Sequence, residues 1–181
     1  MKSVKVIVRK NEERILPIVW ADGENQELTI EAELVGVGAS LSILGIVLGE
    51  GHEQFKLNTN IYHKAPKTKS RVHIRGVLHD HATFENVGLI HIRKGAKHAD
   101  GFFTAKVLLF DDAKGRSVPS LEIDENEVRA GHAATTGQVD ENILFYLQSR
   151  GLDRKEAEKL IVTGFFEPII RELPADLRFK I

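Results

Sequence analysis

An alternation of apolar and polar residues with a period of two runs from Val4 to about Ile123. Between residues 28 and 34, for example, Leu28 and Ile30 alternate with Thr29 and Glu31. Successive side chains of a β-strand point to opposite faces, so alternation over four to eight residues is typical of strands with one buried face. The segments between the alternating runs are short and contain glycine, as at 36–38, 49–51, 94–96 and 113–115. This pattern predicts an all-β body built from many strands and short turns.

The arrangement of these strands is not fixed by the pattern alone. No helical segment separates them, which argues against alternating βαβ units. Strand centres recur at roughly 10–16 residues, a spacing that fits a sandwich, a barrel or a β-solenoid equally well. The periodicity therefore leaves these three architectures open.

The pattern changes after residue 137, where a period near 3.6 replaces the period of two. Asp140 can cap a first helix with apolar residues at 143, 144 and 147, and Gly151 can end it. Asp153 and Glu156 have the spacing of a capping box for a second helix, with an apolar face at 157, 160, 161 and 165. We therefore expect a β body over 1–137 and a C-terminal helical domain over 138–181, its tail a helix broken by Pro168 and Pro174.

The chain contains no cysteine, which excludes disulfides, thiolate catalysis and any cysteine-ligated metal or iron–sulfur site built by this chain alone. The net charge of −1 gives no global field toward nucleic acid or anionic lipid, so we expect neither nucleic-acid nor membrane binding. The N-terminal residues lack the apolar run of a signal peptide, and the apolar run at 41–48 is too short to span a membrane. These features predict a soluble, cytoplasmic protein.

Several blocks, in order, resemble the SufB/SufD family of iron–sulfur cluster assembly scaffold proteins. Residues 119–123 followed by 128–135 resemble its P-x-L-E-I … V-x-C-x-H-G-A-T run, and 137–140 with 144–151 resemble its G-x-L-D … L-F-Y-L-x-S-R-G block. Residues 63–70 resemble H-x-A-P-x-T-x-S, and 75–78 resemble R-G-V-L. The blocks span roughly Gly36 to Glu172 and lack the family's long N-terminal extension, so we expect a short, core-only, SufD-like member.

The resemblance implies a right-handed parallel β-helix followed by a helical hairpin. It also implies a non-enzymatic role in the SUF system, as a scaffold subunit that acts with the ABC-type ATPase SufC. The pairing partner implied is a SufB-like subunit, with a second copy of this chain (a homodimer) as the alternative. The C-terminal helices are the family's docking surface for SufC, which points to Phe145, Tyr146, Arg150, Phe165 and Phe166 as partner-binding residues. Alternatively, these aromatic residues pack on the end of the β body and cap it.

His132 matches the family histidine, a candidate ligand for a cluster or for iron at a partner interface, because a neutral imidazole suits iron. The alternative is a structural histidine that satisfies backbone carbonyls at a turn. By the same resemblance, Ala130 and Ala105 stand where the family's cysteines fall, so this chain cannot accept persulfide sulfur. We therefore expect no cofactor held firmly by this chain alone.

A rival metal site can be read at His79, His81 and Glu85, whose H-x-H-x-x-x-E spacing resembles the metal motif of cupins. On a strand the two histidines would share a face. Against it, the second cupin motif is absent, and an outer strand face rich in histidine (His73, His79, His81, His91 and His98) explains the pattern as well. Glu122 is expected to point outward from its strand. The third possibility is a β-solenoid that binds proteins and performs no chemistry.

Overall fold

The computed structural model describes residues 2–21 and 23–175, which form ten strands and two helices. The strands are β1 (Lys2–Val8), β2 (Glu13–Trp20), β3 (Gln26–Leu34), β4 (Ser40–Gly49), β5 (Gln54–His63), β6 (Lys69–Leu78), β7 (Thr83–Ile92), β8 (Asp100–Leu109), β9 (Lys114–Ile123) and β10 (Arg129–Gln138). The helices α1 (Glu141–Ser149) and α2 (Arg154–Glu172) follow.

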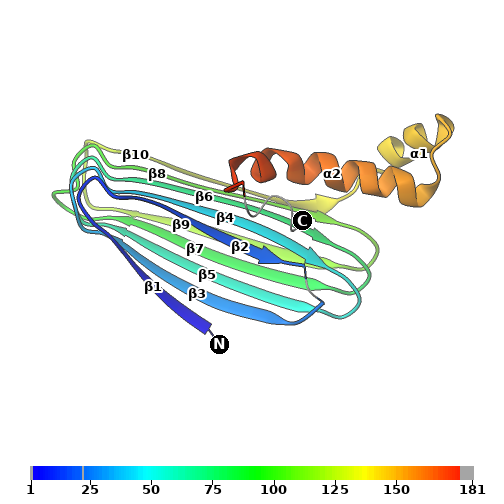
Figure 1. Cartoon of the computed structure of the whole chain (residues 1–181), viewed down its shortest axis with the longest axis horizontal. Helices are drawn as coiled ribbons and strands as arrows, with labels where there is room; N and C mark the ends of the chain where they lie inside the picture. The colour runs from blue at the N-terminus through cyan, green and yellow to red at the C-terminus, as the bar shows by residue number, and fades with distance from the viewer. Residues whose placement is uncertain (1, 22, 176–181) are drawn as a thin grey trace.

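The strands form two parallel sheets, one of odd-numbered strands in the order β1-β3-β5-β7-β9 and one of even-numbered strands in the order β10-β8-β6-β4-β2. The chain passes from one sheet to the other after every strand, so each odd–even pair makes one coil and the coils stack (Figure 1). Thr83, for example, pairs with Gln54 of the coil before and with Lys114 of the coil after. This is a β-solenoid, as the family resemblance implies, and neither a sandwich nor a barrel.

The core lies between the two sheets and explains the alternation in the sequence. Inward side chains such as Phe55, Phe84 and Phe103 are almost completely buried, while their neighbours along the strands face outward. Strand β4 departs from the alternation because both of its faces are covered. Its inner residues belong to the main core, and Leu44 and Ile46 on its outer face belong to a second apolar cluster with the helices.

Stacked four-residue turns hold the coils in register at the corner that follows the even strands. In the turns 50–53, 79–82 and 110–113, the second residue (Gly51, Asp80 or Asp111) has a positive φ of 60°, 56° or 51°. Glycine adopts this conformation without strain, and aspartate tolerates it. The Asp80 carboxylate accepts a hydrogen bond from the Gly51 N–H (2.9 Å), and the Asp111 carboxylate accepts one from the Asp80 N–H (3.2 Å). Each aspartate thus ties its own turn to the one before.

The caps and starting points of the two helices are those predicted from the sequence. Asp140 caps α1 by accepting from the Asn142 N–H, Asp153 and Glu156 form the capping box of α2, and Gly151 has a φ of 98°. Helix α2 packs on the outer faces of β4 and β6, and its Ala157, Phe166 and Ile169 are buried in the apolar cluster formed with these strands. Within 2–21 and 23–175, no helix is long and apolar enough to cross a membrane.

Two details of the hairpin differ from the expectations. Ile143 and Leu160, placed on the apolar faces by spacing, are about half exposed, because each helix buries only a narrow stripe. The expected break is also wrong, since α2 continues through Pro168 to Glu172. A proline inside a helix removes one backbone hydrogen bond and tends to kink it. Here the Arg75 guanidinium of β6 donates to the Phe165 carbonyl and lies 5.1 Å from the centre of the Phe165 ring, which holds this part of α2 on the sheet.

Candidate functional site

The end of the solenoid formed by β9 and β10 is uncovered among the residues that the structure describes. Each of these strands pairs on one side only, with β7 and β8 respectively. Leu121 and Ala130 pack on the core from the last coil but are only partly buried, and Ile123 is 47% exposed. The alternative in which the hairpin aromatics cap an end of the β body does not apply to this end, because the helices pack on the outer faces of β4 and β6.

His132 lies in the middle of β10, paired with Phe103 of β8. The expectation of a turn at this position is therefore wrong. Residues paired in register in a parallel sheet point to the same side, so His132 lies on the inward side, next to the buried Phe103. It is nevertheless exposed, because no further coil covers it among residues 2–21 and 23–175. The structure thus presents this imidazole at the open end of the solenoid.

The two alanines at the cysteine positions also lie on inward positions near this end. Ala130 of β10 pairs with Gly101, and Ala105 of β8 is buried and pairs with Ala134 of β10. Thiols at these places would face the interior and the open end, close to the row that carries His132. A methyl group at each place offers neither a metal ligand nor a nucleophile.

The free edges of β9 and β10 differ in what they offer to another strand. Arg129 and Val139 donate toward β8, so the alternate residues from Ala130 to Gln138 direct their N–H and C=O groups to the free edge. In β9, Lys114 and Asp124 donate toward β7, which leaves Pro119 with its missing N–H on the free edge. Proline is tolerated at such a position and removes a donor from any added strand. The free edge of β10 therefore offers an N–H donor at every alternate residue, whereas the free edge of β9 lacks a donor at its centre.

The aromatic residues of the hairpin divide into two groups. Phe145 and Tyr146 of α1 are 74% and 56% exposed, and the Arg150 guanidinium lies 5.2 Å from the centre of the Tyr146 ring. Phe166 of α2 is buried, and Phe165 is half-buried under Arg75. The exposed apolar side chains of the hairpin, which we call the α1 patch, are Ile143, Phe145 and Tyr146 of α1 and Leu160 of α2.

A buried polar network surrounds His63, and the sequence did not predict it. Thr68 donates to the Ala65 carbonyl (3.0 Å), so its oxygen accepts from the Nδ1–H of His63 (2.8 Å). Nε2 of His63 is then the acceptor for the Ser70 hydroxyl (2.8 Å). Burial lowers the pKa of His63 from 6.5 to about 4; Asp100 opposes the shift and Arg71 adds to it. The spacing of histidine, threonine and serine in residues 63–70 was the available signal.

The Ser70–His63 hydrogen bond is of the kind that activates a nucleophile in hydrolases. Both side chains are completely buried, however, so no substrate reaches the hydroxyl. The arrangement fits a structural clamp that joins the end of β5 to the start of β6.

The cupin-like set does not come together. His79 and His81 lie in the turn between β6 and β7 rather than on a strand, so the expectation of a shared strand face is wrong. The His79 ring stacks on Phe110, the His81 ring stacks on His52, and Glu85 forms an ion pair with Arg116. Among residues 2–21 and 23–175, no three His, Asp or Glu side chains are arranged to hold a metal ion as they stand.

The remaining histidines do not form one outer face either. His73 of β6 contacts Glu172 at the end of α2 (3.0 Å), whereas His91 of β7, on the other sheet, contacts Asp124 (2.8 Å) and Glu122 (3.4 Å). His98 lies at the opposite corner from His81, near Glu127. The outward position of Glu122 agrees with the expectation for this residue.

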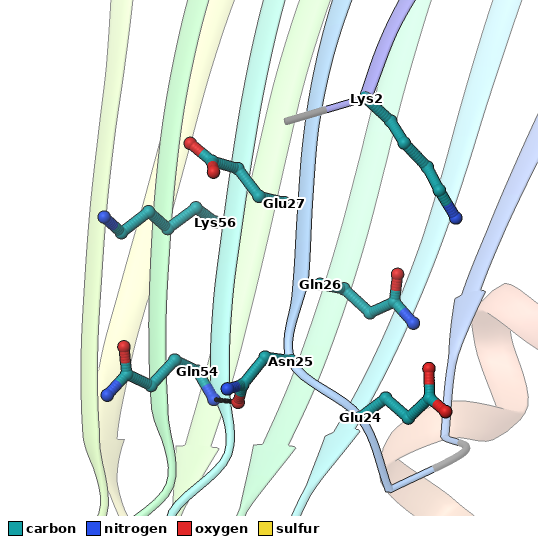
Figure 2. Close-up of a pocket in the computed structure, with 7 residues that line it drawn as sticks. All are labelled: Lys2, Glu24, Asn25, Gln26, Glu27, Gln54 and Lys56. Carbon is teal, nitrogen blue, oxygen red and sulfur yellow. Dashed lines mark hydrogen bonds between the residues drawn. The ribbon is translucent and has the colours of Figure 1, made fainter.

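A shallow hollow near the first coils carries no comparable chemistry. Figure 2 shows its lining side chains spreading apart, with one hydrogen bond between them, from the Gln54 N–H to the Asn25 side chain (2.7 Å). All but one of them are exposed, and both signs of charge are present. The lining residues are Lys2, Glu24, Asn25, Gln26, Glu27, Gln54 and Lys56.

Comparison with known proteins gives a family match that includes the open end of the solenoid. The family model described as "SUF system FeS cluster assembly, SufBD core domain" matches residues 10–165, which include all of β2 to β10 and the first part of the hairpin. The chain belongs to the SufBD family. The match covers the open end of the solenoid and the α1 patch, but its last residue is Phe165.

Individual relatives agree with the family match. The chain is 36% identical over 164 residues to the iron–sulfur cluster assembly protein SufD of Bacillus subtilis, which covers 88% of this chain and 38% of the Bacillus protein. It is 33% identical over 166 residues to an iron–sulfur cluster assembly SufBD family protein of Mycobacterium tuberculosis, covering 91% of this chain and 18% of that protein. The chain thus spans well under half the length of these relatives.

Proposed function

We propose that this SufBD-family chain is a SufD-like, non-catalytic subunit of a cytoplasmic scaffold on which iron–sulfur clusters are assembled. The observation that carries the proposal is the position of His132, on the inward face of an uncovered last coil and beside a free strand edge. An imidazole held there is open to a second subunit and to whatever that subunit brings. The relatives named above as iron–sulfur cluster assembly proteins support the same role.

The first proposed partner is a SufC-type ABC ATPase, bound through the α1 patch. Exposed aromatic side chains with an adjacent arginine are the residue types that dominate binding energy at protein interfaces. Three of the four residues of the patch lie on α1, which is capped and packed through Leu144, so these side chains are presented rigidly. Phe165 and Phe166 would then support the docking surface from below rather than touch the ATPase.

Replacing Phe145 by Ala is expected to weaken binding of the ATPase by at least tenfold without lowering the stability of the chain, because the ring is exposed. The measurement is a pull-down, or a titration of the ATPase against the purified chain. Ile15→Ala is the matched control, since Ile15 is also exposed and apolar but lies on β2. ATPase binding that is the same for the Phe145 variant and the Ile15 variant would count against docking at the α1 patch.

The second proposed partner is a SufB-like subunit or a second copy of this chain, paired through the open end of the solenoid. The free edge of β10 offers its backbone N–H and C=O groups to an added strand. The partly buried residues Leu121, Val128 and Ala130 offer apolar surface. A two-fold pairing of β10 with β10 of another subunit would be antiparallel and would place two His132 side chains in one interface.

We expect Ala134→Pro to reduce pairing, because it removes the N–H at the centre of the β10 edge. Pro119→Ala, which adds a donor to the edge of β9, is the matched variant and should leave pairing unchanged or strengthen it. The molecular mass in solution, alone and with a SufB-like subunit, reports both. Undiminished pairing by the Ala134 variant would exclude β10 as the pairing edge.

In the paired complex, His132 would offer its imidazole to iron or to a cluster that is the cargo of assembly. Because this chain has no thiolate, the remaining ligands would come from the partner. His132→Ala is therefore expected to lower the iron content and the visible absorption of the reconstituted complex, while pairing is retained. His73→Asn, at a histidine of β6 that contacts Glu172 of α2, is the control, and equal iron content in both variants would make His132 structural.

A further inference from the structure

Three successive turns of the solenoid present two histidines and an aspartate at the same position. These are the third residues of the turns 50–53, 79–82 and 110–113, namely His52, His81 and Asp112. All three are exposed. Neighbouring parallel strands lie about 4.8 Å apart, so the stacking of the turns brings together residues that are far apart in the sequence.

The side chains already contact one another in this column. The rings of His52 and His81 are stacked, with their centres 5.0 Å apart and their planes inclined by 17°. Nδ1 of His81 lies 3.9 Å from Oδ2 of Asp112. The His81 ring therefore contacts a histidine one coil earlier and not its sequence neighbour His79.

The backbone beneath the column is held in place. The His81 N–H donates to the Gly51 carbonyl (2.9 Å), and the carboxylates of Asp80 and Asp111 link the three turns through their backbone N–H groups. The spacing between the side chains is thus fixed, while their exposure leaves the rings free to rotate. The proposed site requires a rotation of the two rings that directs one nitrogen of each toward a common point.

The charge of this corner favours a cation. The three turns contain five Asp and Glu residues and neither Lys nor Arg. Carboxylates gathered on one surface raise the local concentration of cations. Two imidazoles with one carboxylate form a donor set that suits Zn²⁺ and Fe²⁺ rather than Ca²⁺ or Mg²⁺.

We propose that His52 and His81, completed by Asp112, bind one divalent transition-metal ion at the surface of the solenoid. Binding replaces the ring stack by a chelate, with water in the remaining coordination positions. The site is independent of the scaffold role proposed above, because it uses neither His132 nor the free strand edges.

The test is a calorimetric titration of the whole chain with Zn²⁺. We expect one saturable site, weakened at least tenfold in both His52→Ala and His81→Ala and to a smaller extent in Asp112→Asn. His98→Asn controls for a lone exposed histidine, and circular dichroism of each variant checks that the solenoid remains folded. The proposal is overturned if the wild-type chain shows no saturable Zn²⁺ binding, or if His52→Ala binds as tightly as the wild type while folded.

Discussion

Lowering the pH from 7 to 4 is expected to remove about 3 kcal/mol of folding free energy through His63 alone. The pKa of His63 is about 4 in the folded chain, compared with the ordinary value of 6.5, mainly because the imidazole is buried. Between these values the unfolded chain binds a proton that the folded chain does not. The contribution is therefore complete above pH 6.5 and is lost progressively as the pH falls toward 4.

Urea denaturation at a series of pH values measures this effect, but exposed carboxylates also titrate in part of the range. The informative comparison is with His63→Gln, which keeps an amide for the partners Thr68 and Ser70 but cannot be protonated. This variant should be less stable at pH 7 and should lose less stability between pH 6.5 and 4.5 than the wild type. His132→Gln, at an exposed position, should lose as much stability between pH 6.5 and 4.5 as the wild type. If His63→Gln also loses as much as the wild type, the buried imidazole is not responsible for the dependence of stability on pH.

Strands with one buried face were predictable from the sequence, and the strand that carries His132 was not. The inward positions of β10 include Ala130, His132, Ala134 and Thr136, none of which is a large apolar residue. No described coil covers them, so selection for a buried face does not act there as it does on β5 or β7. The alternation fails at the open end for the same physical reason that makes this end a candidate site.

The sequence also could not show which residues meet between coils. His81 stacks on His52, and Asp80 bonds to Gly51, because the turns have equal length and the strands pair in strict register. Because the register is not visible in the sequence, His81 was grouped with its sequence neighbours His79 and Glu85 as a possible metal site. Buried polar residues were missed for a similar reason, since His63 and Ser70 occupy inward positions that the pattern treats as polar and exposed.

Replacing Gly88 by Ala is expected to destabilise the chain by about 3 kcal/mol, at the upper end of what overpacking usually costs. Gly88 of β7 lies opposite Phe103 of β8, whose ring crosses the interior of the solenoid and is buried. A Cβ at position 88 would lie less than 3.0 Å from three atoms of that ring. Because the ring is enclosed by core residues, it cannot move aside without disturbing neighbouring coils.

A double-mutant cycle with Phe103→Leu separates this clash from other effects of the glycine. Phe103→Leu alone should destabilise the chain, because it leaves space in the core. In that background Gly88→Ala should cost at least 1 kcal/mol less than in the wild type, because the added methyl group occupies part of the space. Gly137→Ala, at a strand position where a Cβ meets nothing within 4 Å, should be close to neutral. An equal cost of Gly88→Ala in both backgrounds would show that the Phe103 ring does not require a glycine at this position.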